Sequence, residues 1–119
     1  AIGKVLLAYS SDSEREAALK GVRLLAFTKN TLTTREALNA ELARVRELGF
    51  ALDNEEREEG VHCIGAPIFD YTGAVVATLS VSWPGFRYSQ GEESEKVTKT
   101  KDAAARVSAI LGYNPVKAD

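Results

Sequence analysis

The chain has 119 residues, of which 45% are hydrophobic and 27% are charged, a balance typical of one globular domain with a single hydrophobic core. Its 15 basic and 17 acidic residues give a formal net charge of -2, which argues against a nucleic-acid-binding surface. No apolar run approaches the roughly 18 residues of a membrane span, and a single cysteine excludes an internal disulfide. We therefore expect one cytoplasmic domain over residues 1–119, and the start at Ala1 without methionine or a signal peptide suggests a fragment of a longer protein.

The first third of the chain predicts two short helices. Apolar residues at helical spacing open it: Ile2, Val5, Leu6 and Tyr9. Ser11 and Glu14 have the spacing of a capping box, which predicts a second helix that ends near Gly21. Residues 24–31 then predict either a short strand or a turn.

The clearest predicted helix follows, from Thr33 to Gly49. Thr33 and Glu36 form a second capping-box pattern, and Gly49 is a typical helix end. Its apolar stripe consists of Leu38, Leu42 and Val45. Residues 50–53 then predict a short strand, and the acidic run at 54–59 predicts a solvated loop.

The second half of the chain predicts a hairpin and a long helix. Residues 61–69 and 75–83 are rich in strand-forming types, and the turn Asp-Tyr-Thr-Gly at 70–73 separates them. A helix at 89–111 follows and stops at Gly112. The residues expected to face the sheet are Val97, Ala104, Val107 and Leu111. This order of elements indicates an α+β fold, in which an antiparallel sheet is flanked by helices.

The hairpin register identifies one mixed surface. If Asp70 pairs with Gly73 and no bulge intervenes, the opposed pairs are Phe69 with Ala74, Cys63 with Ser80, and Val61 with Ser82. We call Val61, Cys63, Ser80 and Ser82 the Ser/Cys patch. The other face, expected to be core, carries Ile64, Ala66, Ile68, Val75, Leu79 and Val81. The patch is either a partly buried strand surface with satisfied hydroxyls or the floor of a pocket for a small polar molecule.

His62 and Cys63 invite the interpretation of a catalytic dyad, and the geometry argues against it. Neighbours on a strand point to opposite faces, whereas a nucleophile and its base must lie within hydrogen-bond reach. One histidine and one cysteine also make a structural zinc site improbable, so we expect no catalytic residue, metal or cofactor.

The start of the chain offers a different kind of site. Gly3 and Lys4 lack the preceding glycine-rich stretch of a phosphate loop, so we give them no such role. Ala1 and Ile2 stand at the N-terminus of the first predicted helix, where free backbone N–H groups favour an anion such as a carboxylate. A helix start satisfied by water or by a neighbouring loop is the alternative.

The residues resemble the effector-binding domain of IclR-type transcription regulators over nearly the whole chain. The segments that carry the resemblance are 1–8 (AIGKVLLA), 27–28 and 31–33, 42–50 (LARVRELGF), 52–56 (LDNEE) with 60–63 (GVHC), 66–70 (APIFD), 79–82 (LSVS) and 87–89 (RYS). The acidic stretch from Asp53 to Gly60 looks most like the branch that controls sugar-acid catabolism, including ketodeoxygluconate regulators. Trp83 departs from the pattern, because the family usually has a small residue there.

The resemblance implies a GAF/profilin-like fold whose first strands, and an upstream winged helix-turn-helix domain, precede the present chain. It implies a homodimer or homotetramer that senses a small organic acid or sugar acid, contacts DNA only through the upstream domain and has no membrane contact. The effector-binding positions carried over are Ala1, Ile2, Asp53, Val61, Cys63, Ser80 and Ser82. Four of them form the Ser/Cys patch, which favours the pocket over the plain strand surface.

A mechanism follows in which no bond is broken. The helix start at Ala1 and Ile2 would receive the effector carboxylate with help from the serine hydroxyls, and Asp53 would accept a hydrogen bond. Binding would then bias the arrangement of paired subunits and of their DNA-binding domains. The competing functions are an oligomerisation module with a vestigial pocket and a metabolic enzyme acting on a small acid; the absence of a base–nucleophile pair argues against the enzyme.

Overall fold

The computed structural model describes residues 1–21, 32–54, 60–85 and 90–115. In chain order the elements are α1 (Ile2–Ala8), α2 (Asp12–Leu19), α3 (Arg35–Leu48), β1 (Ala51–Asn54), β2 (Val61–Phe69), β3 (Val75–Pro84) and α4 (Gln90–Ile110). The strand or turn predicted at 24–31, the predicted loop beyond residue 54 and the predicted helix start at Ser89 lie outside the described residues. The predicted α+β class is confirmed.

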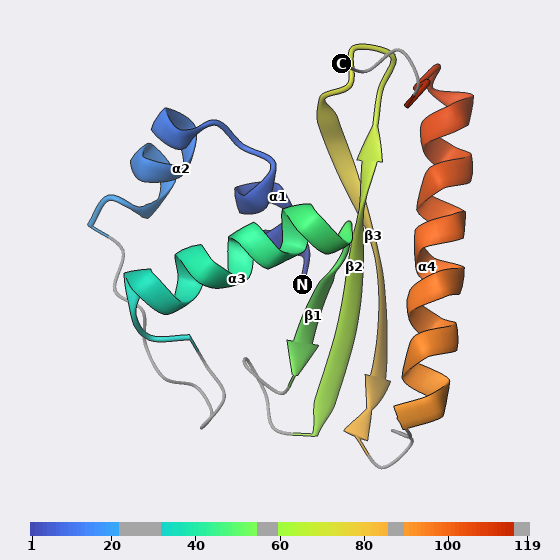
Figure 1. Cartoon of the computed structure of the whole chain (residues 1–119), viewed down its shortest axis with the longest axis horizontal. Coiled ribbons are helices and arrows are strands. Elements are labelled where there is room, and N and C mark those ends of the chain that lie inside the picture. The colour runs from blue at the N-terminus through green and yellow to red at the C-terminus, as the bar shows by residue number, and fades with distance from the viewer. Residues whose placement is uncertain (22–31, 55–59, 86–89, 116–119) are drawn as a thin grey trace.

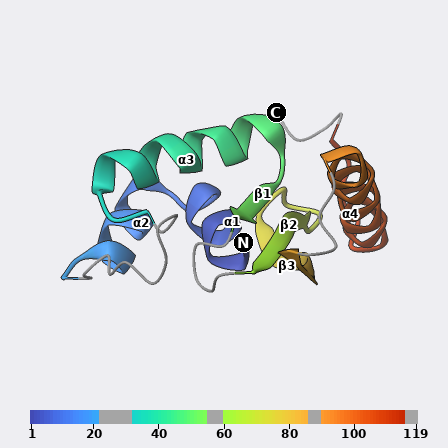
Figure 2. The same cartoon turned by 90° about the horizontal axis from the view of Figure 1, so that it is seen from below.

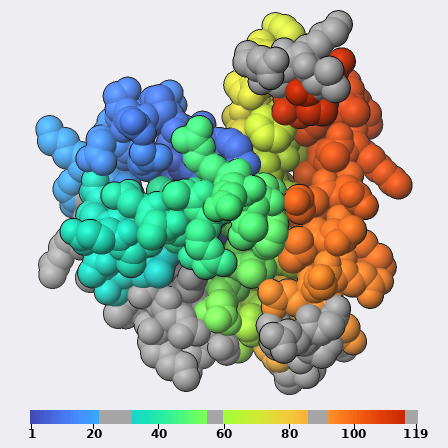
Figure 3. Space-filling view, viewed as in Figure 1, coloured from blue at the N-terminus to red at the C-terminus, as the bar shows by residue number. Residues whose placement is uncertain are grey.

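The described elements form three layers. The strands pair antiparallel in the order β1-β2-β3, so β2 is central. Figure 1 shows this sheet nearly edge-on, with α1, α2 and α3 on one side and α4 along the other. Figure 2, viewed from below, shows the same separation of the helices by the sheet. In Figure 3 the side chains of α3 and β1 meet those of α4 across the front edge of the sheet.

The helix starts follow local capping chemistry. The predicted cap Ser11 is confirmed, because its Oγ accepts a hydrogen bond from the Glu14 amide at 3.1 Å. The predicted cap Thr33 is wrong by one residue: Thr34 caps α3, and its Oγ1 accepts from the Ala37 amide at 3.1 Å. Two adjacent threonines offer the same hydroxyl, so the capping-box spacing alone selected the wrong one.

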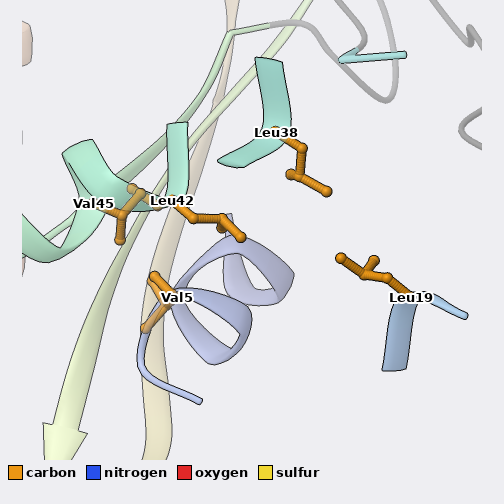
Figure 4. Packing of buried hydrophobic residues seen from close by; sticks show 7 residues of the cluster. Val5, Leu19, Leu38, Leu42 and Val45 are labelled. Carbon is orange, nitrogen blue, oxygen red and sulfur yellow. The ribbon is translucent and has the colours of Figure 1, made fainter. Parts of the chain in front are cut away.

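The larger core lies between α1, α2, α3 and β1. Its buried residues are Val5, Ala8, Leu19, Leu38, Leu42, Val45 and Ala51. The apolar stripe predicted for α3 is therefore confirmed. Figure 4 shows Leu42 and Val45 above Val5 of α1, while Leu19 of α2 points toward Leu38. Ile2 and Leu6, by contrast, remain about half exposed on the outer side of α1.

On the other side of the sheet, α4 follows the predicted row only in part: Ala104 is buried and Val97 is half-buried, as predicted. Thr100, Ala104 and Ser108 are buried at a spacing of four, whereas Val107 is 38% exposed and Leu111 is 42% exposed. The two hydroxyls can be buried because they donate back to the carbonyls one turn earlier, at 2.7 Å and 2.9 Å. Val107 lies beside this row and Leu111 beyond the last turn, so a prediction based on apolar residues alone was wrong for both.

The hairpin register differs from the predicted one by two residues. Cys63 lies opposite Ser82, not Ser80, and Val61 lies opposite Pro84. One residue of the shift arises in the turn, where the Asp70 amide donates to the Ala74 carbonyl at 3.0 Å. The other arises at a bulge between Ile68 and Phe69, where the register slips by one residue. Two slips of one residue restore the alternation, so the predicted faces hold from Val61 to Ile68.

The bulge changes the face of the residues near the turn. Val75, predicted to join the core face, lies opposite Phe69, and the Phe69 ring contacts Tyr9 at the end of α1 with ring centroids 5.6 Å apart. Further along, the face that meets α4 keeps its predicted members. Ile64, Ala66 and Ile68 are buried, and Leu79 packs against the cluster that contains Ala66 and Ile68, although Val81 is 40% exposed.

Candidate binding site

A row of three residues crosses the sheet on the side of α1. Asp53 of β1 pairs with Cys63 of β2, and Cys63 pairs with Ser82 of β3. The Cys63 Sγ lies 3.0 Å from the Ser82 Oγ, a hydrogen bond in which either atom can donate. Because directly opposed residues share a face, a carboxylate, a thiol and a hydroxyl stand side by side across the three strands.

The next row along the sheet brings the start of α1 onto the same face. Gly65 pairs with Ser80, and a Cβ at Gly65 would lie only 3.2 Å from the Ala1 Cβ and from the Ala1 carbonyl carbon. The missing side chain therefore lets the first turn of α1 rest on the sheet. In this position the Ala1 nitrogen lies 3.9 Å from the Asp53 Oδ2, and the Ala1 side chain is 1% exposed. The helix start and the carboxylate thus occupy one corner.

The remaining predicted site residues lie at the margins. Val61 is half-buried opposite Pro84 at the end of the hairpin, and the Ile2 side chain is 47% exposed. Ser80 and Ser82 are exposed. Six of the seven predicted residues therefore lie on or beside one surface of the sheet, while Ile2 contributes its place in the first turn of α1 but not a buried side chain. In the described residues this surface is open on the side of β3.

His62 and Cys63 face opposite ways, as strand alternation predicts. The His62 ring stacks on Trp83 on the α4 side, with centroids 5.9 Å apart, while Cys63 contacts Ser82 on the α1 side. Trp83 is buried beneath Lys96 of α4, whose Nζ lies 5.5 Å from the ring centroid. The large side chain at this position therefore fills space under α4 and does not enter the predicted site.

Lys4 has a role that the sequence analysis did not find. Its Nζ donates to the Leu52 carbonyl at 2.6 Å and lies 3.9 Å from the Glu41 Oε1. These contacts join α1 to both β1 and α3, immediately beside the Asp53 corner. A lysine in the first turn of the first predicted helix was visible in the sequence. Its partners are distant in sequence, however, so its contacts are known only from the fold.

The described residues hold no group of three His, Cys, Asp or Glu side chains that could bind a metal ion. They also form no helix long and apolar enough to cross a membrane. The groups that the candidate site offers are hydrogen-bond donors and acceptors: two hydroxyls, a thiol, a carboxylate and the backbone at the start of α1.

The model of the family described as "Bacterial transcriptional regulator IclR C-terminal" matches residues 1–109. The chain belongs to the IclR family. The HTH-type transcriptional regulator KdgR of Escherichia coli strain K12 is 46% identical over 114 residues, which cover 96% of this chain and 43% of KdgR. The chain thus spans less than half the length of that IclR relative, and the predicted likeness to the KdgR branch is confirmed.

Solved structures of IclR-family regulators agree. The crystal structure of the C-terminal domain of E. coli KdgR matches with a TM-score of 0.87, covering 95% of this chain and 69% of that one. A double mutant of the PobR inducer-binding domain from Acinetobacter, in complex with 3-hydroxybenzoic acid, matches with a TM-score of 0.79 at 25% identity, covering 88% and 60% of the two chains. The chain is accordingly an IclR C-terminal, effector-binding domain of a transcription regulator.

Proposed function

We propose that this domain binds a small organic acid or sugar acid on the α1 side of the sheet, at the Ser/Cys patch, Asp53 and the start of α1. The observation that carries the proposal is the row of Asp53, Cys63 and Ser82, which lies beside the helix start above Gly65. Neighbouring carboxylate and hydroxyl groups on one sheet surface suit a ligand that both donates and accepts hydrogen bonds.

Each group has a role in the proposed complex. The effector carboxylate lies at the N-terminus of α1, beside Ala1 and Ile2, where free N–H groups and the helix dipole favour an anion. The Ser80 and Ser82 hydroxyls donate to the same carboxylate. Asp53 accepts a hydrogen bond from an effector hydroxyl or from water, while Cys63 and Val61 shape the floor. All seven predicted residues are used, and no covalent bond changes.

The ligand class is supported by the relatives. The PobR domain is named as an inducer-binding domain and was solved with 3-hydroxybenzoic acid, a small organic acid. The 46% identity to KdgR favours the sugar-acid branch for this chain. We infer that the effector carries one carboxylate and at least one hydroxyl or oxo group.

We further propose how binding reaches DNA. In the longer protein that the relatives suggest, a winged helix-turn-helix domain and the first strands of the sheet precede residue 1, and the regulator acts in the cytoplasm as a homodimer or homotetramer. The effector shifts the population of subunit arrangements, and so the spacing of the DNA-binding domains. In this scheme the domain is a sensor and not an enzyme, and it requires no cofactor.

The open surface also favours a second candidate, an oligomerisation module whose pocket no longer binds. Ser80 and Ser82 are exposed, as they would be if no effector had to be enclosed. Calorimetric titration of pyruvate, gluconate and glucuronate into the chain distinguishes the two candidates. The sensor binds at least one of these acids, whereas the module gives no heat of binding with any of them.

The decisive variant is Asp53→Ala. Loss of one pocket hydrogen bond should weaken binding of the acid that the wild type binds by about two- to twelvefold, the equivalent of about 0.5–1.5 kcal/mol. The matched control is Asp102→Ala, on the exposed side of α4. A variant at Asp53 that binds normally but melts at a lower temperature than the control would mean that Asp53 is structural, and the proposal would lose its carboxylate.

A further inference from the structure

A second cavity lies at the edge of the sheet, away from the proposed effector site. β1 pairs only with residues 62–65 of β2, so the last four residues of β2 extend beyond it. A cavity of about 300 Å³ lies beside this free edge, between the end of α3 and α4. Its lining residues include Tyr9, Phe69, Lys101, Ala104, Ala105 and Ala109. None of them belongs to the proposed effector site.

The free edge of β2 is poorly suited to accept another strand. Pro67 has no amide N–H to donate, and the Phe69 amide already donates to the Ser108 Oγ of α4 at 2.9 Å. Proline and covered amides are the ways in which proteins protect a sheet edge from pairing. The cavity is therefore suited to a small molecule and not to an added strand.

The cavity is lined by aromatic rings and by small side chains. The Phe69 ring packs edge-on against Tyr9, with centroids 5.6 Å apart, and stacks on Tyr113 with centroids 4.6 Å apart. The part of the lining that comes from α4 includes the alanines at positions 104, 105 and 109. A lining of aromatic rings and alanine methyl groups is apolar, and it suits an apolar ring more than a polar or highly charged ligand.

The polar groups of the cavity are mainly hydrogen-bond donors. The Lys101 Nζ donates to the Leu48 carbonyl at the end of α3, at 3.0 Å, and an ammonium group has three protons to donate. Burial raises the pKa of the Tyr9 hydroxyl above its ordinary value of 10.0, although the positive charge of Arg46 acts against it. Tyr9 therefore remains a protonated donor at neutral pH. A ligand should offer these groups an acceptor.

We propose that this cavity is a second ligand site, which takes a single-ring aromatic molecule with one hydrogen-bond acceptor group directed at Lys101. An apolar cavity of roughly 150 Å³ is large enough for benzene, so about twice that volume accommodates one ring and its substituent. Small pockets of this kind, apolar with a few placed polar groups, are typical ligand sites. The inference goes beyond the proposed effector site and does not depend on it.

Benzoate is the probe, because it combines one ring with one acceptor group. We expect its titration into the chain, followed by NMR of the alanine methyl groups, to shift Ala104, Ala105 and Ala109 through the ring current. Acetate, which lacks the ring, should leave these signals unmoved. Lys101→Met should weaken benzoate binding by about tenfold, as expected for loss of a charge-assisted hydrogen bond.

The cavity is tested directly by filling it. Ala105→Leu should weaken benzoate binding by about tenfold or more, because the added atoms occupy the space of the ring. Ala109→Leu serves the same purpose if the first variant does not fold, and Ala40→Leu, on an exposed face of α3, is the matched control that should bind normally. Asp53→Ala should also bind benzoate normally. Absence of binding to the wild type, unchanged binding to both cavity variants, or loss of binding only in Asp53→Ala would overturn the proposal.

Discussion

The two sides of the sheet are packed in different ways. On the α1 side, branched side chains such as Leu42 and Val45 close a core that is fully apolar. On the α4 side, the helix approaches β2 through one alanine and two hydroxyls, at Ala104, Thr100 and Ser108. Both sides therefore bury apolar side chains, with Ile64, Ala66, Ile68 and Trp83 on the α4 side. Among the described residues, however, buried hydroxyls take part in the packing on the α4 side alone, where Ser108 accepts a hydrogen bond from the Phe69 amide.

The difference explains where each side leaves room. The α1 side concentrates its large residues at one end, so that the surface around Cys63 and Ser82 stays open. The α4 side has small residues along the second half of the helix, and these line the cavity beside Phe69. A binding surface can thus lie where a core of large side chains ends, as on the α1 side, or where small side chains leave a cavity, as beside α4.

The largest expected effect is on the dense side. Leu42→Ala should lower the free energy of unfolding by about 2–5 kcal/mol, because Leu42 is 2% exposed at the centre of the core. Urea denaturation measures the change, with the half-exposed Leu48→Ala as the control that should cost much less. If Leu42→Ala cost less than the hydroxyl deletion described next, the contrast between the two sides would be wrong.

A hydroxyl deletion should give the middle effect, on the α4 side. Ser108→Ala leaves the Phe69 amide without its acceptor, which should lower the free energy of unfolding by about 1–3 kcal/mol. Thr98→Ala is the matched control, because the Thr98 hydroxyl donates to the Ser94 carbonyl one turn earlier, on the exposed side of α4. Hydrogen exchange should accelerate at the Phe69 amide in the first variant only; equal exchange in both would contradict this role.

The smallest expected effect lies in the turn that joins the two strands. Hydrogen bonds from the Thr72 hydroxyl and amide lower the pKa of Asp70 below its ordinary value of 3.8. A lowered pKa means that Asp70 contributes stability above the unfolded-state pKa, and that this contribution is lost as the pH falls through the folded-state pKa. Asp70→Asn should therefore melt slightly below the wild type at pH 7, and the difference should vanish in acid.

The same turn allows a direct check of the cause. Thr72→Val removes the hydroxyl donor, so an NMR titration should find the pKa of Asp70 closer to 3.8 than in the wild type. An unchanged pKa in this variant would show that the hydroxyl is not responsible.

Local chemistry made much of the fold predictable. The Ser11 cap, the stripe through Leu42 and the alternation that separates His62 from Cys63 all depend on neighbours in sequence. The faces of the hairpin from Val61 to Ile68 were also correctly predicted, although the pairing was not and Val75 near the turn was placed on the wrong face. The turn and the bulge each add one residue, and beyond the bulge the two shifts cancel in the alternation. Because side chains alternate between the two faces of a strand, a register shift of two residues leaves each side chain on its predicted face.

The features that could not be predicted depend on contacts between distant residues. The buried row of α4 includes Thr100 and Ser108, whose burial requires partners that a hydropathy pattern does not register. A glycine such as Gly65 usually destabilises a strand, and its role is evident only from the fold, in which the first turn of α1 packs directly against it. The candidate residues were proposed from the sequence, whereas the exposure of Ser80 and Ser82 and the nearby Lys4 contacts became known only from the packing of the elements.

The paired shifts of the hairpin also determine which changes of chain length it can accept. Deleting one residue between Asp70 and Ala74 would send Ser80 and Ser82 toward α4 and turn Leu79 and Val81 toward the start of α1. Deleting a residue at the bulge as well would return both serines to the side of Asp53. Natural or engineered variants of this domain should therefore tolerate insertions and deletions in the hairpin in compensating pairs and not singly.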